Sequence, residues 1–331
     1  MLCPDDIRRA CAYKASHDSN SNSNSSNWKQ PVWRGNNMGK QQYCPSYNIA
    51  PSANTPVLVS GKHFKDDNED ITGESRVIQS MRWGLIPSWY KDKPSAFSLS
   101  TNNCRSESFL DKPLYKNPVS RGRRCAIICE GYYEWKTVNK TKQPYLIHNI
   151  QPENVILADE KWHNIDKSCT NNSELCTEWK GPRLLYLAGV FDVCHPKESE
   201  EPVYSYSVLT MDSSKELSWL HHRMPVVLDT DDAVQDWLDF ESLPVSKVQH
   251  LIKHPKELKW YPVSDSVNNS RNNFAQCIIA VDEKKLKLSA ESNMMMAWLK
   301  KDTNKSETGK RKLKSEVEEQ SKKILKTDNP S

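Results

Sequence analysis

Short apolar runs, separated by polar turns that contain Pro or Gly, recur along the chain as far as about residue 284. Residues 125–129 and 184–192 are nearly continuous apolar runs, and residues 203–210 alternate between apolar and polar side chains. Runs of this length with turn residues at their ends are typical of strands. Helical spacing occurs at residues 6–15, 231–240 and 245–252. The pattern therefore predicts more strands than helices.

Most successive strands are expected to pair in antiparallel fashion, because short turns join them. The clearest case is the polar turn at residues 136–142, which leads into a strand at residues 143–148. We predict a mixed α/β (α+β) domain over residues 1–284, with a strongly curved, mostly antiparallel, barrel-like sheet and peripheral helices. Residues 118–124 are expected to form a turn, and residues 277–281 the last core strand.

Three segments lack the apolar residues needed for a core. Residues 16–27 are almost entirely Ser and Asn, and residues 165–178 are polar, so both are expected to be flexible insertions. Residues 285–331 are expected to form a disordered tail of mixed charge. Within it, residues 300–331 carry ten Lys or Arg and six Asp or Glu. This excess of four positive charges equals the net charge of the whole chain, +4. The basic run at residues 310–314 indicates a nuclear import signal or a solvated segment.

The composition narrows the class of protein. The 331 residues include no apolar run long enough to span a bilayer and no secretory signal peptide, so no membrane association is expected. Ten Cys at irregular spacings then indicate reduced thiols in the cytosol or nucleus. Cys169, Cys176, Cys194 and His195 lack the paired C-x₂-C spacing of zinc sites, so neither a metal site nor a cofactor is predicted.

The first candidate for chemistry is Glu134, which lies between Tyr133 and Trp135 just after the apolar run at residues 125–129. Apolar neighbours would remove water from the carboxylate and raise its pKa, as general acid–base chemistry requires. The alternative is an alternating strand in which Glu134 faces solvent and the two aromatic residues face the other side. This stretch alone favours that alternative.

Two further polar groups are candidate sites. His221 and His222 precede Arg223 in a segment that must turn into a strand, where an imidazole could shuttle a proton near neutral pH. The alternative is a pair of surface His. Asn103 and Arg105 could orient a sugar and a phosphate, or could be turn residues.

An aromatic and basic cluster surrounds a Gly–Pro turn: Arg82, Trp83, Trp89 and Tyr90. Such side chains could stack unpaired nucleobases. Trp83 is instead expected in the core, whereas Trp89 and Tyr90 are compatible with either role.

Several motifs occur in the order and spacing seen in SRAP-domain proteins. They are residues 47–51 (YNIAP), 83–89 (WGLIPSW), 103–107 (NCRSE), 130–135 (EGYYEW), 220–225 (LHHRMP), 262–264 (PVS) and 268–272 (NNSRN). The chain resembles this family over about residues 11–281, and it is the agreement of the motifs that carries the resemblance.

The resemblance implies a sensor and processor of abasic sites in single-stranded DNA at replication forks. In the family, a cysteine next to the initiator Met traps the ring-opened abasic aldehyde through its α-amine and thiol. The product is a thiazolidine, a covalent crosslink that shields the lesion. Lyase-like and peptidase-like chemistry, a nuclear location and a monomer are also implied. The family fold agrees with the predicted barrel-like sheet.

The resemblance also implies roles for individual residues. Glu134, His221 and Asn103 would be catalytic: Glu134 would shuttle protons, His221 would assist at the deoxyribose, and Asn103 would orient the sugar or the N-terminal residue. The residues expected to bind DNA are Arg105, Arg223, Trp89, Tyr90 and Pro51.

The start of the chain departs from the family. The family begins Met-Cys-Gly-Arg, whereas this sequence begins Met1-Leu2-Cys3-Pro4, so the crosslinking cysteine is expected to be absent from it as written. Three interpretations remain: a mis-started or spliced form of an active protein, a variant that binds without crosslinking, or substitution by Cys3. In the tail, Gln320 is followed by Ile324 and Leu325 without an aromatic pair, so replication-fork partners are expected without a clear clamp-binding motif.

Two other functions fit the same residues. One is a non-covalent reader of single-stranded DNA or of modified cytosine (5-hydroxymethylcytosine). The other is a globular α/β protein in which Glu134 and His221 are structural. A reader should depend on Trp89 and Arg105, and a catalytic protein on Glu134.

Overall fold

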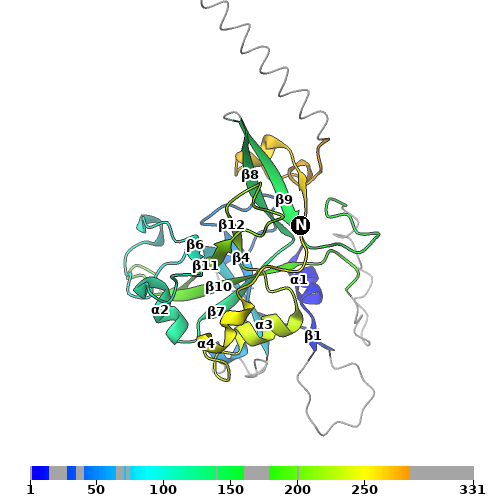
Figure 1. Ribbon diagram of the computed structural model, residues 1–331. Coiled ribbons are helices and arrows are strands. Elements are labelled where there is room, and N and C mark those ends of the chain that lie inside the picture. The colour runs from blue at the N-terminus through cyan, green and yellow to red at the C-terminus, as the bar shows by residue number, and fades with distance from the viewer. Residues whose placement is uncertain are drawn as a thin grey trace, which may run out of the picture. The chain divides into compact units, whose positions relative to one another are not determined.

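The computed structural model describes residues 2–14, 28–34, 41–64, 71, 75–138, 141–159, 179–199 and 201–282 (Figure 1). The predicted insertions at residues 16–27 and 165–178 lie outside the described residues, as does the predicted tail at residues 285–331. Contacts along the chain separate Met1–Ala280 from Val281–Ser331. All the elements below belong to the first of these units.

Five strands form a closed barrel. They are β4 (Asn54–Ser60), β5 (Arg76–Trp83), β7 (Arg124–Cys129), β10 (Leu185–Cys194) and β11 (Val203–Asp212). Four neighbouring pairs are antiparallel, and the ring is completed by a parallel pairing of β11 with β5, which sets Tyr206 opposite Trp83. The predicted mixed fold with a mostly antiparallel, barrel-like sheet is therefore confirmed.

The barrel strands are apolar on both faces because both faces are covered. Ile128 on β7 packs in a cluster with residues of the helices, such as Trp237, whereas its neighbour Ile127 packs in a second cluster with Met81 and Tyr206. The helices are α1 (Pro4–Ala10), α2 (Pro113–Ser120), α3 (Asp231–Leu238) and α4 (Val245–Val248). Successive residues of a strand thus serve two separate cores.

A three-stranded sheet extends beyond the barrel. It contains β8 (Gly131–Val138), β9 (Thr141–His148) and β13 (Lys259–Pro262), in the order β13-β9-β8. The predicted hairpin is confirmed, with Glu134 opposite Tyr145 in the register of β8 and β9. Because β8 begins just after β7 ends, the hairpin carries Glu134 out from the barrel edge (Figure 1).

Shorter elements complete the described fold. The strands are β1 (Tyr13–Lys14), β2 (Trp28–Lys29), β3 (Val32–Arg34), β6 (Asn103–Arg105) and β12 (Arg223–Pro225). The 3₁₀ turns are Gly61–His63, Pro94–Ala96, Gln249–Leu251, Asp265–Asn268 and Ala275–Cys277. Both β6 and β12 pair with β11, which brings two chemically distinctive segments to one strand. Within the described ranges, no helix is long and apolar enough to cross a membrane.

One prediction of local structure is wrong, and another is only partly correct. The expected last strand at residues 277–281 is a 3₁₀ turn that ends at Cys277, followed by a single bridge between Val263 and Ala280. Cys277 and Ile278 pack under the β8–β9 hairpin without joining a sheet, whereas Ile279 is exposed. The expected turn at residues 118–124 is confirmed for residues 121–122, but residues 118–120 form the end of α2, which contains Pro118 and is held by buried Tyr115 and Val119. Tertiary packing decides both cases, and a local pattern does not reveal it.

Candidate functional site

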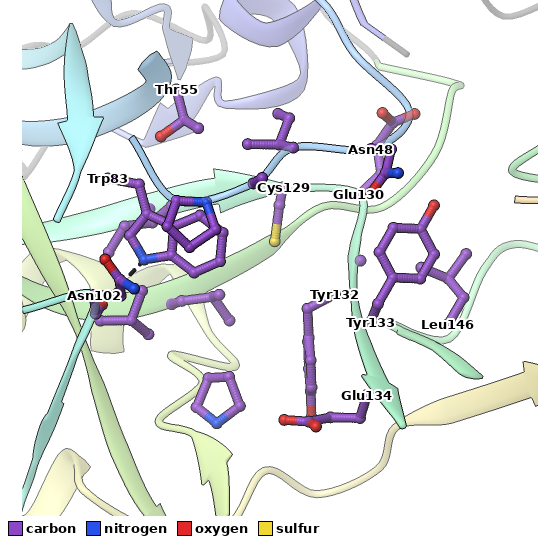
Figure 2. A pocket seen from close by; sticks show the side chains of 18 of the residues that line it. Asn48, Thr55, Trp83, Asn102, Cys129, Glu130, Tyr132, Tyr133, Glu134 and Leu146 are labelled. Carbon is purple, nitrogen blue, oxygen red and sulfur yellow. Dashed lines mark hydrogen bonds between the residues drawn. The ribbon is translucent and has the colours of Figure 1, made fainter. Parts of the chain in front are cut away.

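A cavity of about 720 Å³ opens where the end of the barrel meets the β8–β9 hairpin (Figure 2). Its walls include six of the eight residues predicted for the site: Pro51, Asn103, Arg105, Glu134, His221 and Arg223. They come from four separate parts of the chain, which the pairing of β6 and β12 with β11 brings together. Trp89 and Tyr90 are not among the residues that line it.

Glu134 faces this cavity as part of an alternating strand. Figure 2 shows Glu134 and Tyr133 directed to different sides of β8, and Tyr133 packs with Trp135 in the small core under the hairpin. The Glu134 side chain is 25% exposed to solvent. Its burial raises the pKa of the carboxyl group, and the nearby His221 opposes this rise. The alternation along this strand is thus as the sequence suggests, but Glu134 faces a cavity and not open solvent.

His221 is the partner of Glu134, with its Nδ1 3.6 Å from Oε1 of the carboxyl group. The same Nδ1 lies 2.9 Å from the Arg223 carbonyl oxygen and 3.2 Å from the Arg223 backbone nitrogen. The shorter contact favours the tautomer in which Nδ1 carries the proton and donates it to that carbonyl. In this neutral form Nε2 is the proton acceptor of the ring.

Arg223 is held by carboxylates. Its guanidinium donates two hydrogen bonds to Glu107, at 2.8 and 2.9 Å, and one to Asp212 at 2.7 Å. A further bond reaches the Thr210 carbonyl oxygen at 2.6 Å. Glu107 raises the pKa of Arg223, and Arg223 lowers that of Glu107. The positive charge expected to bind phosphate is therefore neutralised within the protein.

Arg105 presents the opposite case. It is exposed at the end of β6, lines the cavity, and pairs with no carboxylate among the described residues. Asn103, on the same strand, is also exposed at the cavity. Arg105 is thus the cation of this site that is available to an anionic ligand.

Arg82 and Trp83 have structural roles next to the cavity. The Arg82 guanidinium donates hydrogen bonds of 2.8 Å to both the carbonyl and the hydroxyl oxygen of Ser52. Ser52 adopts a φ of 80°, which is unusual for a residue with a side chain, so Arg82 fixes the turn that presents Pro51. Trp83 is half-buried and donates from its Nε1 to the Asn102 carbonyl oxygen at 3.0 Å.

Trp89 and the half-buried Tyr90 form a patch separate from the cavity. Trp89 is 63% exposed, and its ring meets Tyr90 edge-on with centroids 6.3 Å apart. Tyr90 in turn packs edge-on against Phe97 at 5.0 Å. The exposure of Trp89 leaves its ring accessible to a ligand.

Three residues that line the cavity were not predicted as site residues from the sequence. Leu2 is 2% exposed, lines the cavity, and accepts a hydrogen bond from Tyr43 through its carbonyl oxygen. Cys129 also lines it, and burial raises the pKa of its thiol to about 12. Asn48 donates to the carbonyl oxygens of Val267 and Asn269, which joins two loops of the cavity wall. No local pattern marks these positions, because only the fold brings them to the cavity.

Cys3, by contrast, does not line the cavity. Its thiol donates to Asp6 at 3.0 Å, and burial together with this bond raises its pKa. Within the described ranges, no group of three His, Cys, Asp or Glu could hold a metal ion.

Comparisons with known proteins identify the family of this chain. A family model described as SOS response associated peptidase (SRAP) matches residues 9–270. The abasic site processing protein HMCES of Xenopus tropicalis is 41% identical over 310 residues, which cover 92% of this chain and 85% of that protein. The HMCES protein of Gallus gallus is 38% identical, covering 89% and 81%. The abasic site processing protein YMR114C of Saccharomyces cerevisiae is 28% identical, covering 71% and 52%.

Proposed function

Because the chain belongs to the SRAP family, we propose that it is a DNA-damage enzyme that binds and processes abasic sites in single-stranded DNA. The observation that carries the proposal is the partly buried Glu134, whose carboxyl group lies 3.6 Å from His221 in a cavity that also contains Arg105. A carboxyl group whose pKa is raised by burial, next to an imidazole, is suited to general acid–base catalysis.

The proposed chemistry uses the aldehyde of the ring-opened sugar. A primary amine adds to the aldehyde carbon, and the carbinolamine then loses its hydroxyl group as water to give a Schiff base. Glu134 in its protonated form donates the proton that this departing hydroxyl needs. Asn103 orients the sugar, and His221 moves protons on the deoxyribose side. The amine is proposed to come from the start of the polypeptide, since Leu2 lines the same cavity.

DNA binding is proposed to involve two surfaces. Arg105 and Arg223 hold phosphates that flank the lesion, and Pro51 contacts the sugar within the cavity. The exposed Trp89 and the half-buried Tyr90, both outside it, stack on neighbouring bases. Because backbone phosphates dominate the affinity, binding should weaken steeply as salt is added.

A covalent thiazolidine crosslink needs an N-terminal cysteine, and residue 2 of this chain is Leu. A second candidate function is a non-covalent reader of single-stranded DNA or of modified cytosine in the same cavity, and it is supported by the exposed Arg105 that lines this cavity. We also propose a monomer that acts in the nucleus at replication forks, with import through the basic run at residues 310–314, which lies outside the described residues.

One experiment separates these functions. Single-stranded DNA with a single abasic site is incubated with the protein, treated with borohydride to reduce any Schiff base, and separated on a denaturing gel. Wild type is expected to give a shifted band, and Glu134→Gln a strongly reduced one despite unchanged affinity for undamaged DNA. A version rebuilt to start Met-Cys-Gly-Arg is expected to crosslink without borohydride. Binding with no band from any version would favour the reader.

A further inference from the structure

An exposed tryptophan lies two residues before His221. Trp219 retains 39% of its exposure, although the residues beside it are anchored in the core. Leu217 and Leu220 are only 4% and 7% exposed, so they hold this segment in place without help from Trp219. A large apolar ring at the surface is therefore available for another role.

Trp219 rests on other aromatic rings. Its ring meets Tyr145 edge-on with centroids 5.1 Å apart, and it is tilted against Trp260 at 6.2 Å. Contacts of this kind hold an aromatic ring in a fixed orientation, which lowers the entropy cost of stacking a ligand on it. The three rings thus form a rigid aromatic surface.

The register of the sheet places this surface beside Glu134. Tyr145 on β9 lies directly opposite Glu134 on β8, so the two side chains share one face of the sheet. Lys136 lies two residues beyond Glu134 and is therefore on the same face. Trp260 on β13 pairs with Ile147, two residues beyond Tyr145, and also belongs to this face. The proposed catalytic carboxyl group and the aromatic rings are thus neighbours.

Lys136 adds a positive charge. Its Nζ lies over the Trp219 ring, 4.6 Å from the centroid. Proteins that bind single-stranded nucleic acid combine aromatic rings, on which bases stack, with cations that contact the backbone. The flexible Lys side chain can move from the ring to a phosphate when a base arrives.

We propose that Trp219 and Lys136 form a nucleotide-binding subsite next to the catalytic cavity. The ring of Trp219 stacks on the nucleobase that flanks the lesion, and Lys136 contacts the phosphate of that nucleotide. This inference rests on the proposed binding of abasic single-stranded DNA. The subsite is a second stacking surface, which lies beside Glu134 and is distinct from the patch of Trp89 and Tyr90.

The test measures binding by fluorescence anisotropy with three single-stranded oligonucleotides. Each carries a stable abasic analogue at its centre; one has bases on both sides, and in the other two the bases on the 5′ or the 3′ side are replaced by base-free spacers. Trp219→Ala is expected to weaken binding of the fully based oligonucleotide by about tenfold. The same variant is expected to bind like wild type to one of the two oligonucleotides with spacers, because that oligonucleotide lacks the base on which Trp219 would stack.

A matched control exists on β2. Trp28 is similarly exposed, at 41%, and also has a lysine over its ring, with Nζ of Lys14 5.6 Å from the centroid. It belongs to the β1–β2 sheet and not to the sheet that carries Glu134, so Trp28→Ala is expected to bind all three oligonucleotides like wild type. Lys136→Gln should lower the salt dependence of binding by about the contribution of one phosphate.

The outcomes separate the two proposals. Failure of wild type to bind any of the oligonucleotides would contradict the proposed function itself. Normal binding by wild type, together with no effect of Trp219→Ala or an equal loss on all three oligonucleotides, would overturn the subsite alone. Trp219→Phe, which keeps an aromatic ring, is measured alongside and should recover part of the affinity if stacking is responsible. Thermal melting of each variant checks that it is folded.

Discussion

Arg223 and Glu107 are joined by two parallel hydrogen bonds, Nη1 to Oε1 at 2.8 Å and Nη2 to Oε2 at 2.9 Å. This fork-to-fork geometry is the one that an arginine uses to hold a phosphate. Glu107 therefore occupies the edge of the guanidinium that a DNA phosphate would need. The Arg223 side chain is only 15% exposed, whereas that of Glu107 is 52% exposed, so the carboxylate is the partner that can leave.

The substitution Glu107→Gln is expected to increase affinity for single-stranded DNA by about two- to fivefold, because the competing ion pair is partly exposed and worth about 1 kcal/mol or less. The salt dependence of binding should become steeper, since Arg223 can then contact a phosphate without first breaking its ion pair with Glu107. Both quantities follow from anisotropy titrations at several salt concentrations. The control Asp212→Asn should have a smaller effect, because this side chain is 85% exposed. Weaker binding by Glu107→Gln would mean that the pair only stabilises the fold.

The raised pKa of Glu134 predicts how stability changes with pH. The folded protein holds this proton at a higher pH than the unfolded chain does. Stability is therefore lost as pH rises from the usual range of a Glu through the raised pKa. Glu134→Gln lacks this loss. Its melting temperature should exceed that of wild type at pH 8, and the difference should shrink as the pH is lowered to 4. A difference that stays constant with pH would show that Glu134 ionises normally in the fold.

Cys3 is expected to be dispensable for processing. Its thiol donates to Asp6, its pKa is raised, and it does not line the cavity. Cys3→Ser should therefore give the same borohydride-trapped band on a denaturing gel as wild type. A lost band, with DNA affinity and melting temperature unchanged, would instead identify Cys3 as a participant in the chemistry.

Gly189 is expected to tolerate no side chain. It lies in β10 between β7 and β11, where an added Cβ would come within 2.5 Å of Ile127 Cδ1 and 2.8 Å of the Ser207 carbonyl oxygen. Gly189→Ala should therefore reduce the free energy of unfolding by about 1–3 kcal/mol, measured by urea denaturation. An unchanged midpoint would mean that the barrel expands at little cost.

Local sequence patterns predict a feature well where it depends on neighbours in the chain. The β8–β9 hairpin follows from two runs and a polar turn, and the alternation along β8 places Glu134 and Tyr133 on different faces. The failures at α2 and at residues 277–281 come from contacts with distant segments. Local apolar spacing carries no information about which partner a segment packs against.

The candidate site shows the same division. Motif resemblance identifies Arg223 and His221 as site residues, but the ion pair between Arg223 and Glu107 joins positions 116 residues apart. The sequence likewise gives no sign that Leu2 reaches the cavity, or that Trp219 lies on the same face as Glu134. These relationships follow from the order of strands in the barrel, which is a property of the whole fold.

The closing of the barrel also has a consequence for biosynthesis. The parallel contact between β5 and β11 joins segments made early and late, and such distant pairings form slowly because a long loop must be ordered first. A nascent chain that has reached residue 150 already contains Glu134 and Arg105, yet it lacks β11 and β12, and with them His221 and Arg223. The wall of the cavity that contains His221 and Arg223 therefore cannot form until synthesis has passed residue 225.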